Sequence, residues 1–349
     1  MNEFNIGSYN IGSNNKPFII AEMSGNHNQS LERAMEIVQA AATAGAHAIK
    51  LQTYTADTMT MPSSKGMFAI TDEQSLWKGK NLYELYEEAH TPWEWHEPLF
   101  AKAKELGILA FSSPFDETAV DFLESLHVPA YKIASFENTD WALLKKVAAT
   151  GKPVIMSTGL ATLADIDESV RILRSNGCQD LILLKCTSTY PASPENSNLK
   201  TIPYLKEIFQ CQVGLSDHTL GIGASVAAVA LGATVIEKHF TLSRAEGGVD
   251  SAFSLEPKEL ADLVTETGRA FFALGKVQTG IQEAEQKSLR FKRSLYVVKD
   301  IQKGALFTKE NLRAIRPGDG LAPKYAEHFW GKPAKENIQA GTALSWDLL

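Results

Sequence analysis

The first 274 residues alternate between short apolar runs and longer segments in which apolar positions recur with helical spacing. Strands that are buried on both faces of a parallel sheet are apolar almost throughout, whereas half-exposed strands alternate. The apolar runs therefore predict parallel strands. Eight such runs are present, at residues 18–22, 48–53, 108–114, 130–135, 153–159, 181–187, 213–218 and 234–240.

A helical pattern follows each predicted strand, and capping residues mark several boundaries. Ser30 opens one helix and Gly45 ends it. Eight strand–helix units over about 250 residues are typical of a TIM barrel. An open doubly wound sheet is the alternative, but no Gly-x-Gly-x-x-Gly motif follows the first predicted strand. The predicted helices cover residues 31–44, 92–106, 116–126, 140–150, 163–176, 199–209, 221–232 and 257–274, with a further short helix at 82–89.

One long insertion interrupts this alternation at residues 54–91. Irregular insertions of this length are uncommon inside a compact domain unless they cover a functional site. We therefore expect the insertion to lie over the site. Three tryptophans in and after it, Trp77, Trp93 and Trp95, are interpreted as packing residues.

The pattern changes after residue 274, which divides the chain into a barrel domain at residues 1–274, a linker at 275–292 and a small unit at 293–349. The linker is polar and aperiodic. The small unit is rich in short β-like runs separated by glycines. Because fewer than 60 residues bury little core, we expect it to pack on another surface.

Composition is ordinary for a soluble globular protein, with 349 residues, a net charge of −7 and a pI near 5.7. This acidic balance disfavours general nucleic-acid binding. The N-terminus lacks a signal-peptide pattern, and no apolar stretch approaches the roughly 20 residues of a membrane span. Cys178, Cys186 and Cys211 form no CxxC pair, which favours reduced thiols and a cytoplasmic location.

Two histidines close the last two predicted strands. His218 and His239 stand 21 residues apart (239 − 218), about the length of one strand–helix repeat. If these strands are parallel neighbours, both imidazoles emerge at the same end of the sheet and can share a divalent metal. The alternative is a pair of buried histidines that are only hydrogen-bonded.

Other polar residues also gather at the predicted strand ends, where the chemistry of a TIM barrel takes place. Lysines and serines suit a phosphate or carboxylate, and the carboxylates Glu22 and Glu137 are acid–base candidates. The set indicates an anionic phosphorylated substrate and a carbonyl compound beside a metal; the alternative is a rim of structural ion pairs. The remaining residues of the set are Lys50, Gln52, Ser112, Ser113, Lys132, Ser135, Ser157, Thr158, Lys185, Thr187, Ser188, Tyr190, Ser216, Asp217 and Glu237.

Several short motifs occur along the chain in a fixed order. They are Ile19-Ile20-Ala21-Glu22 with Asn26-His27, Lys50-Leu51-Gln52, Ser113-Pro114-Phe115, Lys132-Ile133-Ala134-Ser135 with Glu137, Ser216-Asp217-His218 and Glu237-Lys238-His239-Phe240. This ordered set resembles the sialic acid synthase family. The segment from Arg293-Ser294-Leu295-Tyr296 through Arg316-Pro317-Gly318 resembles the antifreeze-like SAF domain that those synthases carry.

The resemblance implies a condensation of phosphoenolpyruvate with an open-chain amino sugar, which yields a nonulosonic acid and phosphate. Leu82-Tyr83-Glu84-Leu85-Tyr86-Glu87 and Cys186-Thr187-Ser188-Thr189-Tyr190-Pro191 look most like the branch that makes pseudaminic acid from 2,4-diacetamido-2,4,6-trideoxy-L-altrose. The alternatives are an acceptor that leads to N-acetylneuraminate or legionaminate, and a non-catalytic carbohydrate-binding protein built on the barrel.

Site residues are carried over position by position from the resemblance. His218 and His239 would bind a divalent metal (Mn²⁺, Mg²⁺ or Co²⁺), and Glu22 or Glu137 would act in catalysis. Arg316 would enter the site of the other subunit in a domain-swapped homodimer. Phosphoenolpyruvate would contact Lys50, Ser113, Lys132, Ser135, Ser157, Ser188 and Ser216, and the sugar would face Glu22, Glu137, Tyr190 and Asp250. Ser113 and Ser188 replace the Thr and Asn that are usual in sialic acid synthases.

Overall fold

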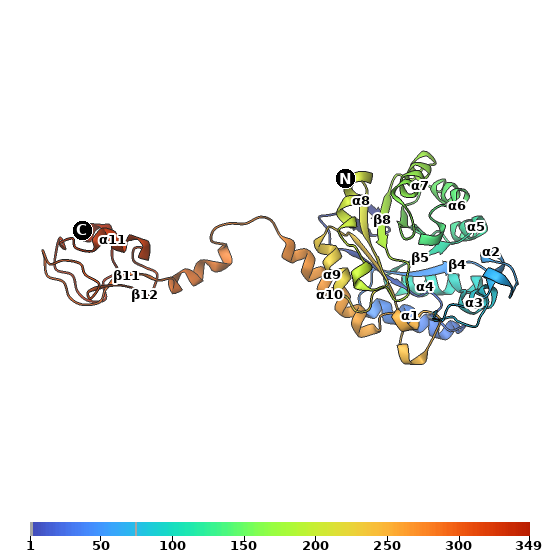
Figure 1. The fold of residues 1–349 in the computed structure, drawn as a ribbon, viewed down its shortest axis with the longest axis horizontal. Coiled ribbons are helices and arrows are strands. Elements are labelled where there is room, and N and C mark those ends of the chain that lie inside the picture. The colour runs from blue at the N-terminus through green and yellow to red at the C-terminus, as the bar shows by residue number, and fades with distance from the viewer. Residues whose placement is uncertain (1–2, 74) are drawn as a thin grey trace. The chain divides into compact units, whose positions relative to one another are not determined.

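The computed structural model describes residues 3–73 and 75–349 (Figure 1). The chain forms two compact units, Met1–Gly275 and Lys276–Leu349, and each has its own hydrophobic core.

The first unit is a closed barrel of eight parallel strands. The last strand pairs with the first, with His239 opposite Glu22, so the sheet has no free edge. The predicted TIM barrel is confirmed, and the open doubly wound sheet is wrong. Neighbours around the barrel follow chain order, from β3 (Phe18–Glu22) through β4 (Ala48–Thr53), β5 (Leu109–Pro114), β6 (Tyr131–Ile133), β7 (Val154–Ser157), β8 (Leu181–Cys186) and β9 (Gln212–Asp217) to β10 (Val235–His239).

An outer layer of helices covers the strands. Side-chain caps fix several N-termini; the Ser30 side chain accepts a hydrogen bond from the Arg33 amide, as the sequence predicted. The helices after successive strands are α1 (Leu31–Thr43), α4 (His96–Glu105), α5 (Glu117–Ser125), α6 (Trp141–Ala148), α7 (Leu163–Ser175), α8 (Thr201–Phe209), α9 (Gly223–Ala230) and α10 (Pro257–Leu274). Single 3-10 turns lie in the connections, at Trp93–Trp95, Ser135–Glu137, Pro194–Asn196, Arg244–Glu246 and Ser251–Phe253.

A β-hairpin precedes the barrel and was not predicted. Its strands β1 (Phe4–Ile6) and β2 (Tyr9–Ile11) pair antiparallel around a turn that contains Gly7, at φ +55°. Ile6 and Ile11 are buried in the barrel core. The alternation of apolar and polar residues around Gly7 carried the signal, but three-residue strands are too short to stand out from the sequence.

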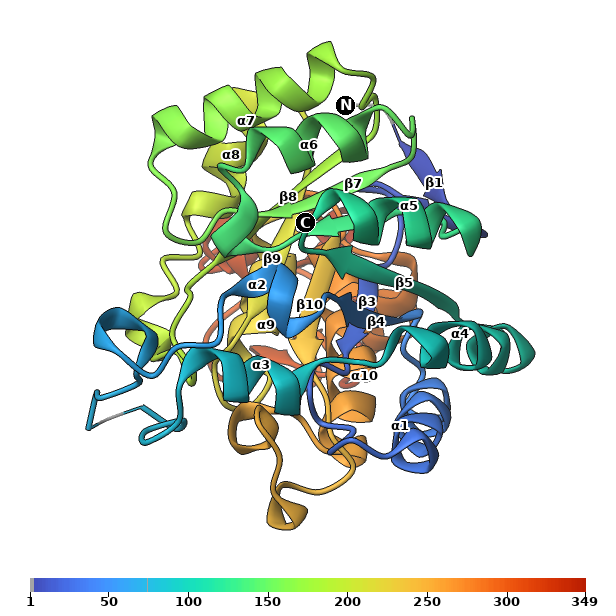
Figure 2. The same cartoon turned by 90° about the vertical axis from the view of Figure 1, so that its right-hand side faces the viewer.

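The insertion at 54–91 contains more structure than the one helix predicted for it. It holds α2 (Ala56–Met59), a 3-10 turn (Gly66–Phe68) and α3 (Leu82–Ala89). Figure 2 shows α2 and α3 in front of the barrel strands, on the side that carries the strand ends. The insertion thus covers the barrel opening, as expected.

The second unit has its own core, in which Leu295, Val297, Phe307 and Phe329 are buried. Its regular elements are β11 (Ser294–Val297), β12 (Leu312–Ile315), a 3-10 turn (Pro323–Tyr325), α11 (Ala326–Phe329) and a final 3-10 turn (Trp346–Leu348). Before them, Glu283–Phe291 forms a 3-10 helix within the predicted linker, and a capping box of Gln282 and Glu285 starts it. This part of the predicted linker is therefore helical although its sequence is polar and aperiodic, and local capping marks where the helix begins.

The closing helix α10 is amphipathic rather than uniformly apolar. α10 buries Leu260, Leu263 and Thr267 and keeps a polar outer face. None of the described helices combines the length and the hydropathy that crossing a bilayer requires.

Gly214 in β9 allows the closest approach between two strands at the barrel wall. A Cβ there would lie 2.1 Å from the carbonyl oxygen of Val235 and 2.7 Å from a methyl group of Leu184. We predict that Gly214→Ala lowers the free energy of unfolding by about 2–3 kcal/mol, because ladder hydrogen bonds hold the backbone in place. Urea unfolding measures this change.

Gly223→Ala is the matched control. Gly223 opens α9, and an added Cβ meets nothing within 4 Å. This variant should match the wild type or gain up to about 1 kcal/mol from helix propensity. Equal unfolding midpoints for the two variants would show that the barrel wall adjusts freely and would contradict the prediction.

Candidate functional site

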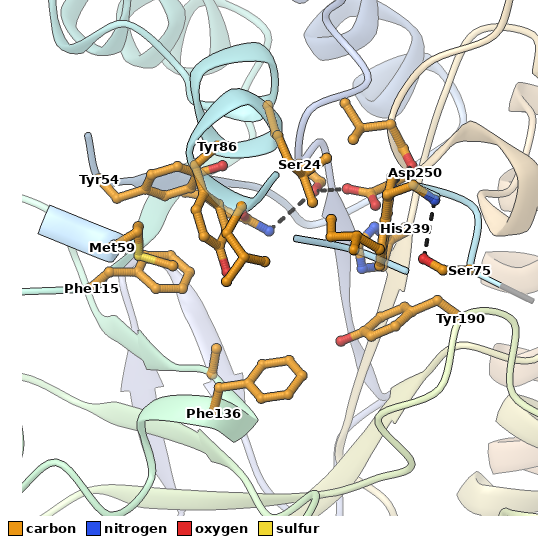
Figure 3. A pocket seen from close by; sticks show the side chains of 18 of the residues that line it. Ser24, Tyr54, Met59, Ser75, Tyr86, Phe115, Phe136, Tyr190, His239 and Asp250 are labelled. Carbon is orange, nitrogen blue, oxygen red and sulfur yellow. Dashed lines mark hydrogen bonds between the residues drawn. The ribbon is translucent and has the colours of Figure 1, made fainter. Parts of the chain in front are cut away.

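A cavity of about 490 Å³ opens at the carboxyl ends of the barrel strands. Figure 3 shows side chains from the strand ends, the following loops and the insertion converging on it. The lining includes Ser24, Gln52, Tyr54, Met59, Ile70, Trp77, Leu82, Leu85, Tyr86, Phe115, Phe136, Glu137, Tyr190, His239 and Asp250. This is the end of the barrel at which sequence analysis expected the site.

Four buried ionic groups form an alternating chain at these strand ends. Lys50 Nζ lies 2.8 Å from Glu22 Oε2 and 3.5 Å from Glu237 Oε2, and Lys132 Nζ lies 3.8 Å from Glu237 Oε1. All four side chains are at most 6% exposed, so an unpaired charge here would be costly. The chain carries two positive and two negative charges and is therefore neutral as a whole.

The ionic chain sets the pKa values of its members. Burial raises the pKa of Glu22 to about 6, against the opposing effect of Lys50. Burial alone would lower the pKa of Lys50, but Glu22 and Glu237 raise it. Burial lowers the pKa of Lys132, whose carboxylate partner is farther away. Lys50 is thus held firmly as a cation, whereas Lys132 depends more on added negative charge.

Serine hydroxyls line the same region. Lys50 Nζ donates to Ser113 Oγ at 3.2 Å, and Lys132 Nζ donates to Ser157 Oγ at 2.7 Å. Ser216 Oγ donates to Glu237 Oε1 at 2.9 Å. The structure therefore brings three of the predicted serines to the ionic chain.

Ser135 and Ser188 converge at Gly159. The Gly159 amide donates to Ser135 Oγ at 3.2 Å. A Cβ on Gly159 would lie 2.3 Å from Ser188 Oγ and 2.7 Å from Ser135 Oγ. Because glycine has no Cβ, it leaves room there for the two hydroxyls. Ser135 and Ser188 are the remaining two members of the predicted serine set.

The two histidines lie next to each other. Their ring centroids are 5.4 Å apart, and Tyr190 packs 4.5 Å from His218. His218 Nδ1 lies 3.0 Å from the carbonyl oxygen of Thr187. If this nitrogen carries the proton, Nε2 is left as a lone-pair donor.

His239 is buried as well. Burial holds its pKa well below the ordinary value, so the ring is neutral. Its Nδ1 is buried without a hydrogen-bond partner. Neutral imidazole nitrogens without partners fit a divalent cation. Within residues 3–73 and 75–349, no cluster of three or more His, Cys, Asp or Glu side chains is arranged to hold a metal ion.

Cys186 extends the histidine pair. Its Sγ lies 3.9 Å from His218 Nδ1. Burial would raise the pKa of this thiol, but the hydrogen bond and charge of His218 lower it to about 7. Sequence analysis counted Cys186 only as a reduced thiol, because its neighbour in space is 32 residues away along the chain.

Glu137 and Asp250 provide two further carboxyl groups. Burial raises the pKa of Glu137 to about 7, although Lys132 opposes the shift. Burial also raises the pKa of Asp250, against a hydrogen bond from Ser24. Gln52 connects Asp250, through Ser24, to the ionic chain by donating to Glu22 Oε1 at 2.9 Å and to Ser24 Oγ at 3.1 Å.

Sequence analysis gave no role to Gln52, Ser24 or Glu237. Gln52 and Glu237 were recognised as strand-end residues, and their partners became visible only in the closed barrel. Trp77 was interpreted as a packing residue, but it lines the cavity and donates from Nε1 to the carbonyl oxygen of Val249 at 2.9 Å. The only sign in the sequence that Trp77 lines the cavity was its position inside the insertion.

The insertion forms an apolar wall of the cavity, together with Phe115 after β5. In Figure 3, Met59 and Phe115 lie across the cavity from His239 and Tyr190. Tyr54 packs edge-to-face against Phe115 and Tyr86, with centroid distances of 5.1 and 5.7 Å. We use the name apolar wall for Tyr54, Met59, Ile70, Leu82, Leu85, Tyr86 and Phe115.

Asn26, His27 and Arg316 were also singled out from the sequence. Asn26 donates to Phe240 O and Ser254 Oγ, both at 2.9 Å, and so ties loops together. His27 is buried, and burial lowers its pKa to about 4. Arg316 follows β12 in the second unit and is exposed.

A family model described as the NeuB family matches residues 37–279, and a model of the SAF domain matches residues 292–349. Pseudaminic acid synthase of Campylobacter jejuni is 47% identical over 97% of this chain and 98% of its own length. Pseudaminic acid synthase of Helicobacter pylori is 44% identical over 95% and 97%. A solved N-acetylneuraminic acid synthetase from Leptospira borgpetersenii superposes with a TM-score of 0.73 at 35% identity, over 82% of this chain and 95% of that one.

Glu137 should make stability depend on pH. Its pKa of about 7 lies above the 4.5 of an ordinary Glu, so the folded state binds more protons between these values and loses stability as pH rises. We predict that Glu137→Gln gains stability over the wild type as pH rises from 5 to 8, approaching about 3 kcal/mol. Urea unfolding across this pH range measures the difference.

Glu168→Gln, at an exposed position on α7, is the control and should show no such trend. A constant difference between Glu137→Gln and the wild type across the range would mean that Glu137 ionises normally.

Proposed function

The chain belongs to the NeuB family, and we propose that it condenses phosphoenolpyruvate with 2,4-diacetamido-2,4,6-trideoxy-L-altrose to give pseudaminic acid and phosphate. The observation that supports this most directly is the buried ionic chain with its serines, placed beside two adjacent histidines at one barrel opening. Such a site suits an anion and a carbonyl compound together. Two pseudaminic acid synthases that align along nearly the whole chain support the choice of acceptor.

The lysines and serines would hold phosphoenolpyruvate. Lys50 and Lys132 offer cationic donors, and their hydrogen bonds to Ser113 and Ser157 orient them. Adding a phosphate and a carboxylate next to Lys132 offsets the burial that lowers its pKa. Ser135, Ser188 and Ser216 would supply further hydrogen bonds to the same ligand.

The carbon–carbon bond forms when the methylene carbon of phosphoenolpyruvate donates its π electrons to the aldehyde carbon of the sugar; the C=O π pair moves to the aldehyde oxygen, which takes up a proton and becomes a hydroxyl group. Positive charge then develops on the carbon that bears the phosphate. Water adds to that carbon and loses a proton, and the tetrahedral adduct expels phosphate by carbon–oxygen cleavage to leave the keto acid. Glu22 and Glu137 are the carboxylates available to stabilise the cation and to accept the proton from water.

His218 and His239 would hold a divalent ion (Mn²⁺, Mg²⁺ or Co²⁺). When bound, such an ion supplies Lewis-acid polarisation of a carbonyl oxygen. Tyr190 packs against the His218 ring and restricts its orientation. Burial in this pocket also excludes water from the aldehyde.

The apolar wall supports a 6-deoxy acceptor. The aldehyde must lie at the histidines, so the other end of the sugar chain points away from the reacting centre and toward the insertion. Met59, Ile70, Leu82 and Leu85 offer no hydrogen bonds there. A terminal methyl group and an acetamido methyl group gain from contact with such a surface, whereas the 6-hydroxyl of N-acetylmannosamine would lose its hydration.

We also propose an assembly and a location for the protein. Arg316 would complete the site of the other subunit in a domain-swapped homodimer, and Asp250 and Tyr190 would contact the sugar. The reaction would take place in the cytoplasm, in keeping with the free, buried Cys178, Cys186 and Cys211.

An acceptor panel tests the proposed function. Phosphate release is measured with phosphoenolpyruvate, Mn²⁺ and each of three sugars: the altrose-type diacetamido sugar, the acceptor for legionaminate, and N-acetylmannosamine. We predict at least about a hundredfold preference in kcat/KM for the altrose-type sugar over N-acetylmannosamine, because one misplaced hydroxyl in an apolar pocket costs about 1–3 kcal/mol and the acetamido group at C4 adds a second difference. Leu85→Asn should narrow the preference, and the exposed Leu160→Asn is its control.

Turnover of N-acetylmannosamine without turnover of the altrose-type sugar would overturn the acceptor. No phosphate release with any sugar would favour a binding protein built on the barrel.

Arg316 tests the swapped assembly. We predict that Arg316→Ala loses activity, and that isolated mixed dimers of Arg316→Ala with His239→Ala recover about half of the wild-type activity per dimer. One site of such a dimer combines an intact barrel with an intact Arg316, and the other site lacks both. Differently tagged subunits allow the mixed dimer to be purified and assayed. Normal kinetics of Arg316→Ala, or an inactive mixed dimer, would contradict the swapped arrangement.

A further inference from the structure

A second ion pair lies behind the two histidines. Asp217 and Lys238 each directly precede a histidine in the chain, and they are register partners in the β9–β10 ladder. Lys238 Nζ lies 2.9 Å from Asp217 Oδ2, and both side chains are 1% exposed. The catalytic scheme above uses neither residue.

The ion pair faces away from the barrel interior. Side chains alternate along a strand, so Ser216 and Glu237 point inward while Asp217 and Lys238 point toward the helix layer. The inward pair is also joined, by the 2.9 Å hydrogen bond from Ser216 Oγ to Glu237 Oε1. The two strand ends are therefore tied together on both faces just before the histidines.

Asp217 also fixes the chain beyond His218. Its Oδ1 accepts hydrogen bonds from the Thr219 amide at 2.9 Å and from Thr219 Oγ1 at 2.8 Å. Its Oδ2 accepts from Ser225 Oγ in α9 at 2.6 Å, and Lys238 Nζ donates to the carbonyl oxygen of Thr219. Both chain neighbours of His218 are thus anchored to β10, and Asp217 is anchored to α9 as well.

We propose that the Asp217–Lys238 ion pair sets the separation of His218 and His239 for metal binding, so that both are positioning residues. The inference rests on the proposed two-histidine metal site. Within the described residues no third side-chain ligand is gathered around that site, so the affinity depends directly on how well two imidazoles are placed. An apolar pair of similar volume could fill the same space without the cost of burying two charges, but it would not tie Thr219 and Ser225 to the strand ends.

The test measures Mn²⁺ binding to the full chain by electron paramagnetic resonance, without substrates. The variant Asp217→Asn with Lys238→Met removes both charges, and so leaves no buried charge without a partner. We expect its Mn²⁺ affinity to fall about tenfold, the loss typical of groups that orient metal ligands. Its affinity for phosphoenolpyruvate, measured by calorimetry on metal-free protein, should stay at the wild-type value.

The same pair of substitutions at Asp121 and Lys146 is the matched control. This Asp–Lys pair, with a distance of 2.6 Å, joins α5 to α6 away from the histidines. The control should bind Mn²⁺ as the wild type does. Ser225→Ala keeps the ion pair and removes one anchor, so it provides a second measurement if the double variant does not fold; its Mn²⁺ affinity should fall, by less than that of the double variant.

Three outcomes would overturn the inference. If the folded double variant, or Ser225→Ala where the double variant does not fold, binds Mn²⁺ as tightly as the wild type, the ion pair only stabilises the fold. If phosphoenolpyruvate affinity falls by the same factor, the whole barrel opening has been disturbed. If neither the wild type nor His239→Ala binds Mn²⁺, the proposed metal site is wrong. The proposed positioning role is then wrong as well.

Discussion

The site depends on one constraint: four charges buried at the end of a barrel must be matched in sign. Glu22, Lys50, Glu237 and Lys132 satisfy it by alternating, with separations of 2.8 to 3.8 Å. Each charge has an opposite neighbour, so both lysines can remain buried as cations. Removing any member would leave a buried charge without compensation, which costs several kcal/mol.

The strand ends and the insertion contribute different kinds of side chain to the cavity. The strand ends carry the charges, serines and histidines on rigid backbone whose register is fixed by the closed sheet. The insertion supplies most of the apolar wall. Loop residues tolerate substitution better than the strands of a barrel, so the apolar wall can vary while the charged strand ends stay constant.

The spacing of the two histidines has a structural meaning. Val235 pairs with Gly214, and Lys238 pairs with Asp217, each with an offset of 21 residues. The same offset separates His239 from His218, so the helix and loops between β9 and β10 have the length that brings the two rings side by side. Ion pairing on the outer face and hydrogen bonding on the inner face then hold the two strand ends at this register.

The sequence by itself determined the barrel, the eight strands, the SAF-like second unit and the family, because apolar periodicity and ordered motifs are local properties of the chain. It also placed the histidines, lysines and serines at one end. Only the tertiary structure decided which of these residues meet: that Glu237 joins two lysines, that Gly159 leaves room for Ser135 and Ser188, that Trp77 lines the cavity, and that Asp217 pairs with Lys238. These contacts join residues 21 to more than 180 positions apart, and their energies arise from burial and distance, which no local pattern encodes.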